Sequence, residues 1–216
     1  MFIGHFGVAF AAKRAAPKTS LGLLVFSAQF VDLLWPILLL LGVEHLEIAP
    51  GITRTSPMNF TYYPISHSLL MGIVWGLVIG GIYYGVRRYA RGAWVVGLAV
   101  LSHWFLDFLV HRPDLPLWPG NSPRVGLGLW NSWPATILLE VLFFGAGLWI
   151  YLRATRPRDN IGRFALWGLA AFLFAGWVST LFAGPPPGTK ALAWGGLAMW
   201  LVVPWAWWAD RHRTTG

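Results

Sequence analysis

Hydrophobic residues along this chain gather in long blocks that short polar stretches separate. Each long block holds about twenty residues, enough to cross the roughly 30 Å hydrocarbon core of a bilayer as a helix. The blocks run over residues 20–42, 63–86, 92–110, 131–152, 161–182 and 191–209. A shorter apolar stretch, residues 2–16, precedes them. The pattern predicts an all-α, polytopic integral membrane bundle of six spans with a short membrane-inserted helix at its start.

Composition supports a membrane protein and excludes a typical soluble enzyme. Of the 216 residues, 56% are hydrophobic and 11% are charged, whereas soluble domains are charged at about 25% of positions. The chain has no cysteine, which excludes disulfides, zinc–thiolate sites and a cysteine nucleophile. Any metal chemistry must therefore use His, Asp and Glu.

The basic residues that give the net charge of +8 are distributed among the loops in the manner of a membrane protein, which does not indicate a surface that binds nucleic acid. If the six spans alternate, twelve of the 16 Lys and Arg residues fall on one side of the membrane. They lie within residues 13–18, 87–91, 153–163 and 211–213. The positive-inside rule then predicts an inner (plasma) membrane protein with its N-terminal turn and C-terminus in the cytoplasm and loops 43–62 and 111–130 outside. Membrane lipids are the expected surroundings, and no nucleic-acid partner is expected.

Polar side chains at membrane depth divide this single transmembrane domain, residues 1–216, into two parts. Ionisable groups inside a bilayer cost free energy, so each needs a partner or a task. They are His5, Asp32, His67, His103, Asp107 and Glu140. All lie within residues 1–152, which we interpret as the helices that carry the site. Residues 153–216 form a Trp-rich structural pair of helices that offers a surface for a membrane-protein partner.

The spacing of two of these groups and of a third residue at the outer rim indicates a shared surface. His103, Asp107 and His111 follow one another at intervals of four residues, so they lie along one helical face. Such a face can bind one ion or form a structural pair that pins helices together. Pro36 has no N–H for the carbonyl of Asp32, which predicts a kink beside that carboxylate.

Helix rise predicts that the polar groups meet at one depth. Counted from the turn at Pro17, His5 and Asp32 rise by about 18 and 21 Å at 1.5 Å per residue. His103 and Asp107 rise by about 18 and 24 Å from Arg91, and Glu140 falls within the same layer. We therefore expect several helices to present ligand-type side chains in the outer half of the membrane.

Short motifs around these residues are similar to those of the bacterial membrane-bound metal-dependent hydrolases. The resemblance covers roughly residues 1–111 and rests on four segments. They are Gly-His-Phe-Gly with His5, Phe-Val-Asp-Leu with Asp32, Pro-Ile-Ser-His-Ser with His67, and Leu-Ser-His-Trp-Phe-Leu-Asp with His103 and Asp107. The chain departs from the family where Pro-Asp-x-Asp is usual, because it has Val31-Asp32-Leu33-Leu34 there.

The resemblance implies a His and Asp metal site similar in kind to that of zinc-dependent phospholipases C. The implied metal ligands are His5, Asp32, His67, His103 and Asp107. Zinc is the expected ion, with manganese or iron as alternatives. Asp107 and Glu140 are the candidate catalytic residues, although Glu140 equally suits a residue that orients a ligand or relays protons. The implied reaction is hydrolysis of a lipid-like phosphoester or ester reached from the outer leaflet.

Two other functions remain open at this point. A proton-coupled transporter would use the same carboxylates and imidazoles as a relay. A non-catalytic subunit of a larger membrane complex would use them to pin helices together. For His111 and Asp114 we expect a solvated loop rather than a role in the site.

Overall fold

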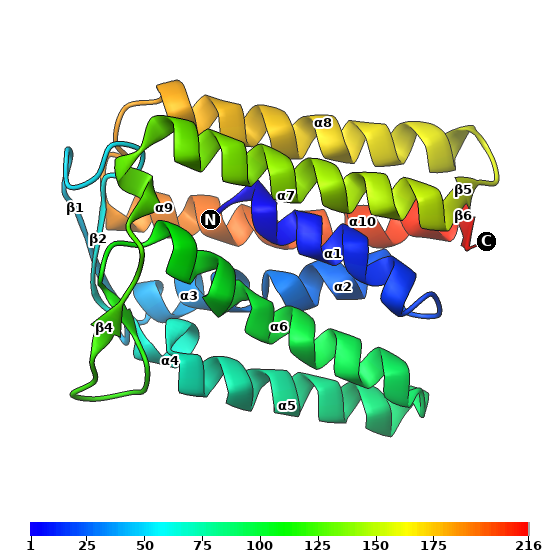
Figure 1. Cartoon of the computed structure of the whole chain (residues 1–216), viewed down its shortest axis with the longest axis horizontal. Helices are drawn as coiled ribbons and strands as arrows, with labels where there is room; N and C mark the ends of the chain where they lie inside the picture. Colours follow the sequence, from blue (N-terminus) through cyan, green and yellow to red (C-terminus); the bar gives the residue numbers. More distant parts are fainter. Residues whose placement is uncertain (216) are drawn as a thin grey trace.

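The computed structural model describes residues 1–215 and shows long helices packed side by side along one axis (Figure 1). Five stretches of helix in this part of the chain have the length and apolar character of a membrane span. They are α5 (Leu69–Arg87), α6 (Ala90–Val110), α7 (Trp133–Ala154), α8 (Asn160–Phe182) and the run that joins α9 (Thr189–Ala198), η2 (Met199–Leu201) and α10 (Val202–Arg211). The predicted all-α polytopic membrane fold is confirmed.

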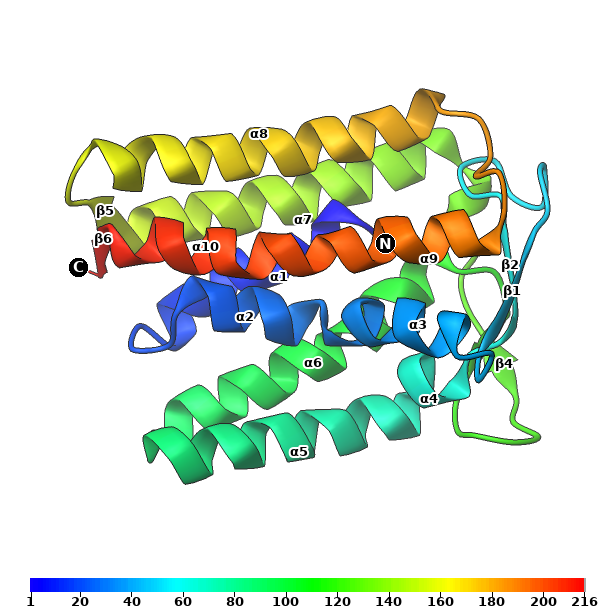
Figure 2. The ribbon, with the colours of Figure 1, turned by 180° about the vertical axis from the view of Figure 1, so that it is seen from behind.

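A further candidate span is a bent pair of helices. Helix α2 (Leu21–Ala28) and helix α3 (Phe30–Leu40) meet at 55°. Gln29 lies at the junction, so this bend is separate from the kink predicted at Pro36, which lies inside α3. Figure 2 shows α2 and α3 as two separate helices that follow one another along the bundle.

The outer faces of the long helices are apolar. Leu77 on α5, Leu138 on α7 and Phe164 on α8 are 64%, 66% and 66% exposed in the isolated chain. In a membrane such side chains contact the acyl chains of the lipids, because the bilayer core contains no water. These exposed faces support the membrane assignment.

Helix α1 (Ile3–Ala15) lies inside the bundle against α2, α6 and α7 (Figure 1). Close approach to α7 depends on two glycines, since a Cβ atom at Gly7 would overlap the carbonyl of Phe143 and one at Gly147 would overlap the carbonyl of Gly7. Small residues bring membrane helices together in this way. The contact sets the depth of α1 and therefore of His5.

A buried ion pair anchors the end of the bundle near the α1–α2 turn. Lys13 Nζ lies 2.7 Å from Asp210 Oδ2, and the Tyr151 hydroxyl donates to Asp210 Oδ1 at 2.7 Å. The backbone N–H of Leu21 donates to the same carboxylate at 3.0 Å. Helices α1, α2, α7 and α10 are thus linked, and the strands β5 (Thr155–Pro157) and β6 (Arg213–Thr215) pair beside them.

The opposite end is covered by short hairpins and aromatic side chains. One antiparallel pair joins β1 (His45–Ile48) to β2 (Met58–Tyr62), and a second joins β3 (Leu115–Pro116) to β4 (Arg124–Val125). The short helices α4 (Pro64–His67) and η1 (Leu129–Asn131) lie at the same end. Phe60, Tyr63, Leu115 and Trp130 form a buried cluster there. This cluster closes the bundle over the end of α6.

Candidate metal centre

The structure brings together the five residues predicted as metal ligands. His5 comes from α1, Asp32 from α3, His67 from α4, and His103 and Asp107 from α6. Two overlapping groups have ligand atoms within 4.8 Å of one another. One consists of His5, His103 and Asp107, and the other of Asp32, His67 and His103.

The group around Asp32 has the spacing of a metal site. Asp32 Oδ1 lies 3.3 Å from His67 Nε2, and Asp32 Oδ2 lies 3.5 Å from His103 Nε2. Asp107 Oδ2 lies 3.3 Å from His103 Nε2 and 3.9 Å from His67 Nε2. Tetrahedral zinc with bonds of 2.0–2.1 Å holds its ligand atoms roughly 3.3 Å apart. The observed separations match that value closely.

The imidazole of His103 turns its free nitrogen toward both carboxylates. Its Nδ1 lies 2.8 Å from the carbonyl oxygen of Ala28, which only accepts hydrogen bonds, so Nδ1 is the donor. In the neutral ring, Nε2 then has no proton and presents its lone pair. This atom is buried and has no hydrogen-bond partner among residues 1–215. A buried lone pair that faces Asp32 and Asp107 calls for a cation or a proton between them.

His67 is oriented by a chain of two buried polar residues. Ser66 Oγ donates to Glu44 Oε2 at 2.6 Å and lies 2.6 Å from His67 Nδ1. Since the serine proton is used by Glu44, His67 Nδ1 must donate to Ser66. Nε2 lies 3.3 Å from Asp32 Oδ1, so it either donates to this carboxylate or shares a cation with it. Glu44 is fixed in turn by the N–H groups of Ile65 and Ser66 at 2.8 and 2.9 Å. This is the arrangement in which an outer carboxylate orients a metal-binding imidazole.

The prediction that His111 and Asp114 lie in a solvated loop is wrong. Their exposed fractions are 2% and 3%, because the aromatic cluster over α6 covers them. His111 Nδ1 lies 3.0 Å from Asp114 Oδ1, and its Nε2 lies 3.7 Å from Asp107 Oδ2. The Tyr63 hydroxyl donates to Asp114 at 3.2 Å, and Arg112 Nε donates to it at 3.1 Å. The helical face predicted from the four-residue spacing therefore includes His111.

His5 reaches the cluster from the opposite side. Its Nε2 lies 3.1 Å from Asp107 Oδ1, and its ring stacks on that of His103 with centroids 3.6 Å apart. The other nitrogen, Nδ1, is buried and lacks a hydrogen-bond partner in the described chain. The Met1 amino nitrogen also contacts Asp107 Oδ1, at 2.5 Å. The two oxygens of Asp107 thus contact different neighbours: Oδ1 contacts His5 and the Met1 amino group, and Oδ2 contacts His103 and His111.

Glu140 lies on α7 beside the start of α1 and outside both groups of ligand atoms. Its carboxylate accepts the backbone N–H groups of Phe2 at 2.6 Å and Gly4 at 2.8 Å. A carboxylate at the beginning of a helix binds otherwise unpaired donors and complements the helix dipole. The geometry favours Glu140 as a residue that positions α1, and through it His5.

Several residues of this site are not identified by any pattern in the sequence. Ser66 directly precedes His67, but nothing in the sequence indicates that its hydroxyl joins the imidazole to Glu44, since a hairpin separates Glu44 from α4. Trp35 is 8% exposed, and its indole N–H has no hydrogen-bond partner among residues 1–215. Its ring lies edge-on to His67, with centroids 6.1 Å apart. Trp35 could have been identified from its position, which is one turn after Asp32 on α3.

Comparison with known proteins provides a family. A family model described as YdjM inner membrane protein matches residues 2–183. The match extends over most of the chain, so the protein belongs to this family. No curated protein and no solved structure matches it.

Proposed function

We propose that this member of the YdjM inner membrane protein family is a metal-dependent hydrolase whose ion binds among Asp32, His67, His103 and Asp107. One observation carries the proposal: His103 Nε2 is buried and has no hydrogen-bond partner in the part of the chain that the structure describes, although it lies 3.3 Å from Asp107 Oδ2 and 3.5 Å from Asp32 Oδ2. A neutral imidazole beside two carboxylates is repulsive without a cation, because lone pairs then face lone pairs. The donor set of imidazoles and carboxylates suits zinc, with manganese or iron as alternatives.

The residues around the ligands keep the site in one geometry. Ser66 and Ala28 fix the tautomers of His67 and His103, while His111 and His5 approach Asp107 from its two sides. A divalent ion bound there would polarise a phosphoryl or carbonyl oxygen and lower the pKa of its water. The protein itself supplies ligand orientation and an apolar surrounding that excludes bulk water.

Access to the site involves Asp32. Its side chain is 37% exposed, whereas those of His67, His103 and Asp107 are 4%, 1% and 3% exposed. Water and substrate would therefore approach at the Asp32 side of the cluster. The indole N–H of Trp35, one turn along α3, has no hydrogen-bond partner within the described residues and is suited to donate to a substrate oxygen.

The substrate that fits this setting is amphiphilic. The ligands lie on helices whose outer faces are apolar, so a reacting group reaches them from the bilayer more readily than from water. We propose a lipid-like phosphoester or ester. We also propose that the Asp32 end faces the outer leaflet, as the distribution of Lys and Arg predicts, and that the Trp-rich helices α9 and α10 are available to a membrane-protein partner.

The decisive experiment measures metal and hydrolysis in the same preparation. The full chain, purified in detergent without chelator, should contain about one zinc, manganese or iron ion per protomer. It should cleave a phosphodiester or carboxylic ester presented in mixed micelles, and His103→Ala should abolish both properties. His45→Ala is the matched control, because His45 is exposed on β1 and belongs to neither group of ligand atoms.

Absence of stoichiometric metal after supplementation with zinc and manganese would overturn the proposal. The cluster would then consist of imidazolium ions paired with carboxylates. Proton flux in vesicles would in that case support a transporter. Absence of both hydrolysis and proton flux would support a structural subunit.

A further inference from the structure

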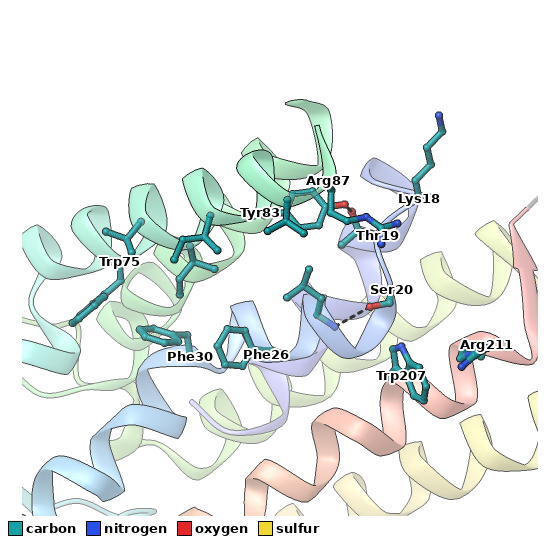
Figure 3. Close-up of a pocket in the computed structure, with 15 residues that line it drawn as sticks. Lys18, Thr19, Ser20, Phe26, Phe30, Trp75, Tyr83, Arg87, Trp207 and Arg211 are labelled. Carbon is teal, nitrogen blue, oxygen red and sulfur yellow. Dashed lines mark hydrogen bonds between the residues drawn. The ribbon is translucent and has the colours of Figure 1, made fainter. Parts of the chain in front are cut away.

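A long groove lies on the side of the bundle between α2, α3, α5 and α10 (Figure 3). Its volume is about 810 Å³, within the range of sites for small molecules. Most of its wall is apolar. Leu23, Phe26 and Phe30 line one side, and Val78, Ile79 and Ile82 line the other.

One end of the groove is strongly basic. Lys18 from the α1–α2 turn, Arg87 from the end of α5 and Arg211 from the end of α10 all line it. The hydroxyls of Thr19 and Tyr83 lie 2.9 Å apart at the same end. The described lining includes no Asp or Glu, so the three cations have no anionic neighbour within the groove. Cations combined with hydroxyl groups are typical of sites that bind phosphate.

The length of the groove matches one leaflet of a bilayer. Trp75 and Arg87 mark its two ends on α5, and this stretch of helix is about 18 Å long at 1.5 Å per residue. Half of a hydrocarbon core of roughly 30 Å is about 15 Å. An acyl chain whose headgroup lies at the basic end would therefore run along the full apolar wall.

The inner end of the groove is closed by two aromatic rings. Phe30 and Trp75 have ring centroids 5.4 Å apart, and the Trp75 indole donates to the carbonyl of Ile65 at 2.9 Å. Asp32 follows Phe30 closely on α3, and His67 follows Ile65 closely on α4. The rings separate the groove from the candidate metal centre and also support two of the segments that carry its ligands.

We propose that this groove binds one anionic phospholipid, with its phosphate at Lys18, Arg87 and Arg211 and an acyl chain along α2 and α5. The charge of the groove selects this occupant. A zwitterionic lipid brings its own cation beside the phosphate, and a neutral helix of a second copy brings no anion, so neither lowers the positive charge of this end as an anionic lipid does. The lipid fills the space between α5 and the α2–α3 pair and braces the Phe30–Trp75 wall. This site is separate from the metal centre and does not depend on the proposed hydrolase activity.

The first test removes the charges. The triple variant Lys18→Gln, Arg87→Gln, Arg211→Gln is compared with Arg153→Gln, an exposed arginine at the end of α7 outside the groove. The control is closely matched, because Arg153 lies over the Trp149 ring at 5.6 Å much as Arg211 lies over the Trp207 ring at 4.7 Å.

The second test fills the groove without changing its charge. Val78→Trp introduces a large ring at a residue that lines the groove, and Leu142→Trp does the same on the outer face of α7. Both positions are exposed in the isolated chain, at 43% and 56%, so both variants should fold.

Binding is measured on the delipidated full chain by native mass spectrometry and by thermal unfolding during titration with phosphatidylglycerol. One bound phosphatidylglycerol per protomer is expected, with affinity reduced roughly 100-fold in the triple variant and retained in Arg153→Gln. Val78→Trp should also lose the lipid, and Leu142→Trp should keep it. Equal retention by groove variants and controls, equal affinity for phosphatidylcholine, or complete displacement by inorganic phosphate would each overturn the proposal.

Discussion

His103 and Asp107 lie one turn apart on α6, with Nε2 of the imidazole 3.3 Å from Oδ2 of the carboxylate. The same imidazole donates from Nδ1 to the carbonyl of Ala28 on α2. A simple structural pair would use a proton on Nε2, which then makes the ring an imidazolium. A metal site would use the lone pair on Nε2. The two interpretations differ in what happens when the charge on Asp107 is removed.

We expect Asp107→Asn to reduce metal affinity by more than about 100-fold while the protein still folds. The amide keeps the shape of the side chain but removes an anion that balances a divalent ion in a medium of low dielectric constant. Metal per protomer and thermal unfolding in detergent are measured together. A chelator should lower the unfolding temperature of the wild type and leave that of the variant unchanged, because only the wild type has bound metal to lose.

His103→Ala distinguishes the two interpretations further. If the pair is structural, the variant leaves the buried Asp107 without its imidazolium, which should cost about 3–5 kcal/mol of stability. Wild-type protein without metal, together with a loss of stability confined to His103→Ala, would favour a structural subunit over a hydrolase.

Ser66→Ala should weaken metal binding by about 10–100-fold without changing the ligands themselves. The serine hydroxyl joins Glu44 to His67 Nδ1, so its removal frees the imidazole to rotate or to change tautomer. The matched control is Ser102→Ala, because Ser102 precedes His103 but its hydroxyl bonds only to the carbonyl of Ala99. Competition with a fluorescent zinc chelator measures both affinities. Identical affinities for the two variants would show that Ser66 has no positioning role.

Much of the fold follows from the sequence because bilayer thickness fixes the length of a spanning helix. The blocks at 92–110 and 161–182 coincide with α6 and α8 to within a few residues. The first part of the predicted block 63–86 is instead the separate helix α4, since Ser68 caps the start of α5 by accepting the N–H of Met71. The bend at Gln29 depends on packing among several helices, which no local pattern in the sequence describes.

The candidate site was predictable to the extent that it follows helix periodicity. Asp107 and His111 lie where their spacing from His103 puts them, and His5 reaches the same depth by the rise along α1. The contact between Glu44 and Ser66 was not predictable, since it depends on how the segment between α3 and α4 folds back. Local periodicity identifies ligands on helices but not the residues that orient them from loops.

Labelling of introduced cysteines tests the orientation, which the native chain permits because it has no cysteine. Cysteine at Asn121, in the loop between α6 and α7, should react with an impermeant maleimide on intact cells. Cysteine at Thr215, near the C-terminus, should react only after the membrane is opened. The excess of Lys and Arg on the C-terminal side is the physical reason for this expectation. The reverse pattern would place the candidate site in the inner leaflet.

Trp35→Phe should reduce hydrolysis while metal content stays at the wild-type level. Phenylalanine keeps most of the ring that packs beside Phe60 and His67 but removes the indole N–H, which has no partner within residues 1–215. If that N–H donates to a substrate oxygen as charge develops, its loss should lower kcat by about 10²-fold or more. If it donates equally to the substrate in the ground state and in the transition state, KM should rise and kcat should stay constant.

Trp94→Phe is the control for this substitution, because Trp94 is 69% exposed on the outer face of α6 and distant along the helix from the ligands. The unfolding temperature of each variant shows whether packing has changed. A Trp35→Phe protein that keeps both its kinetics and its metal would exclude the indole from substrate binding. Since a buried donor without a partner destabilises the resting protein, such a variant should then also be more stable than the wild type by about 1 kcal/mol.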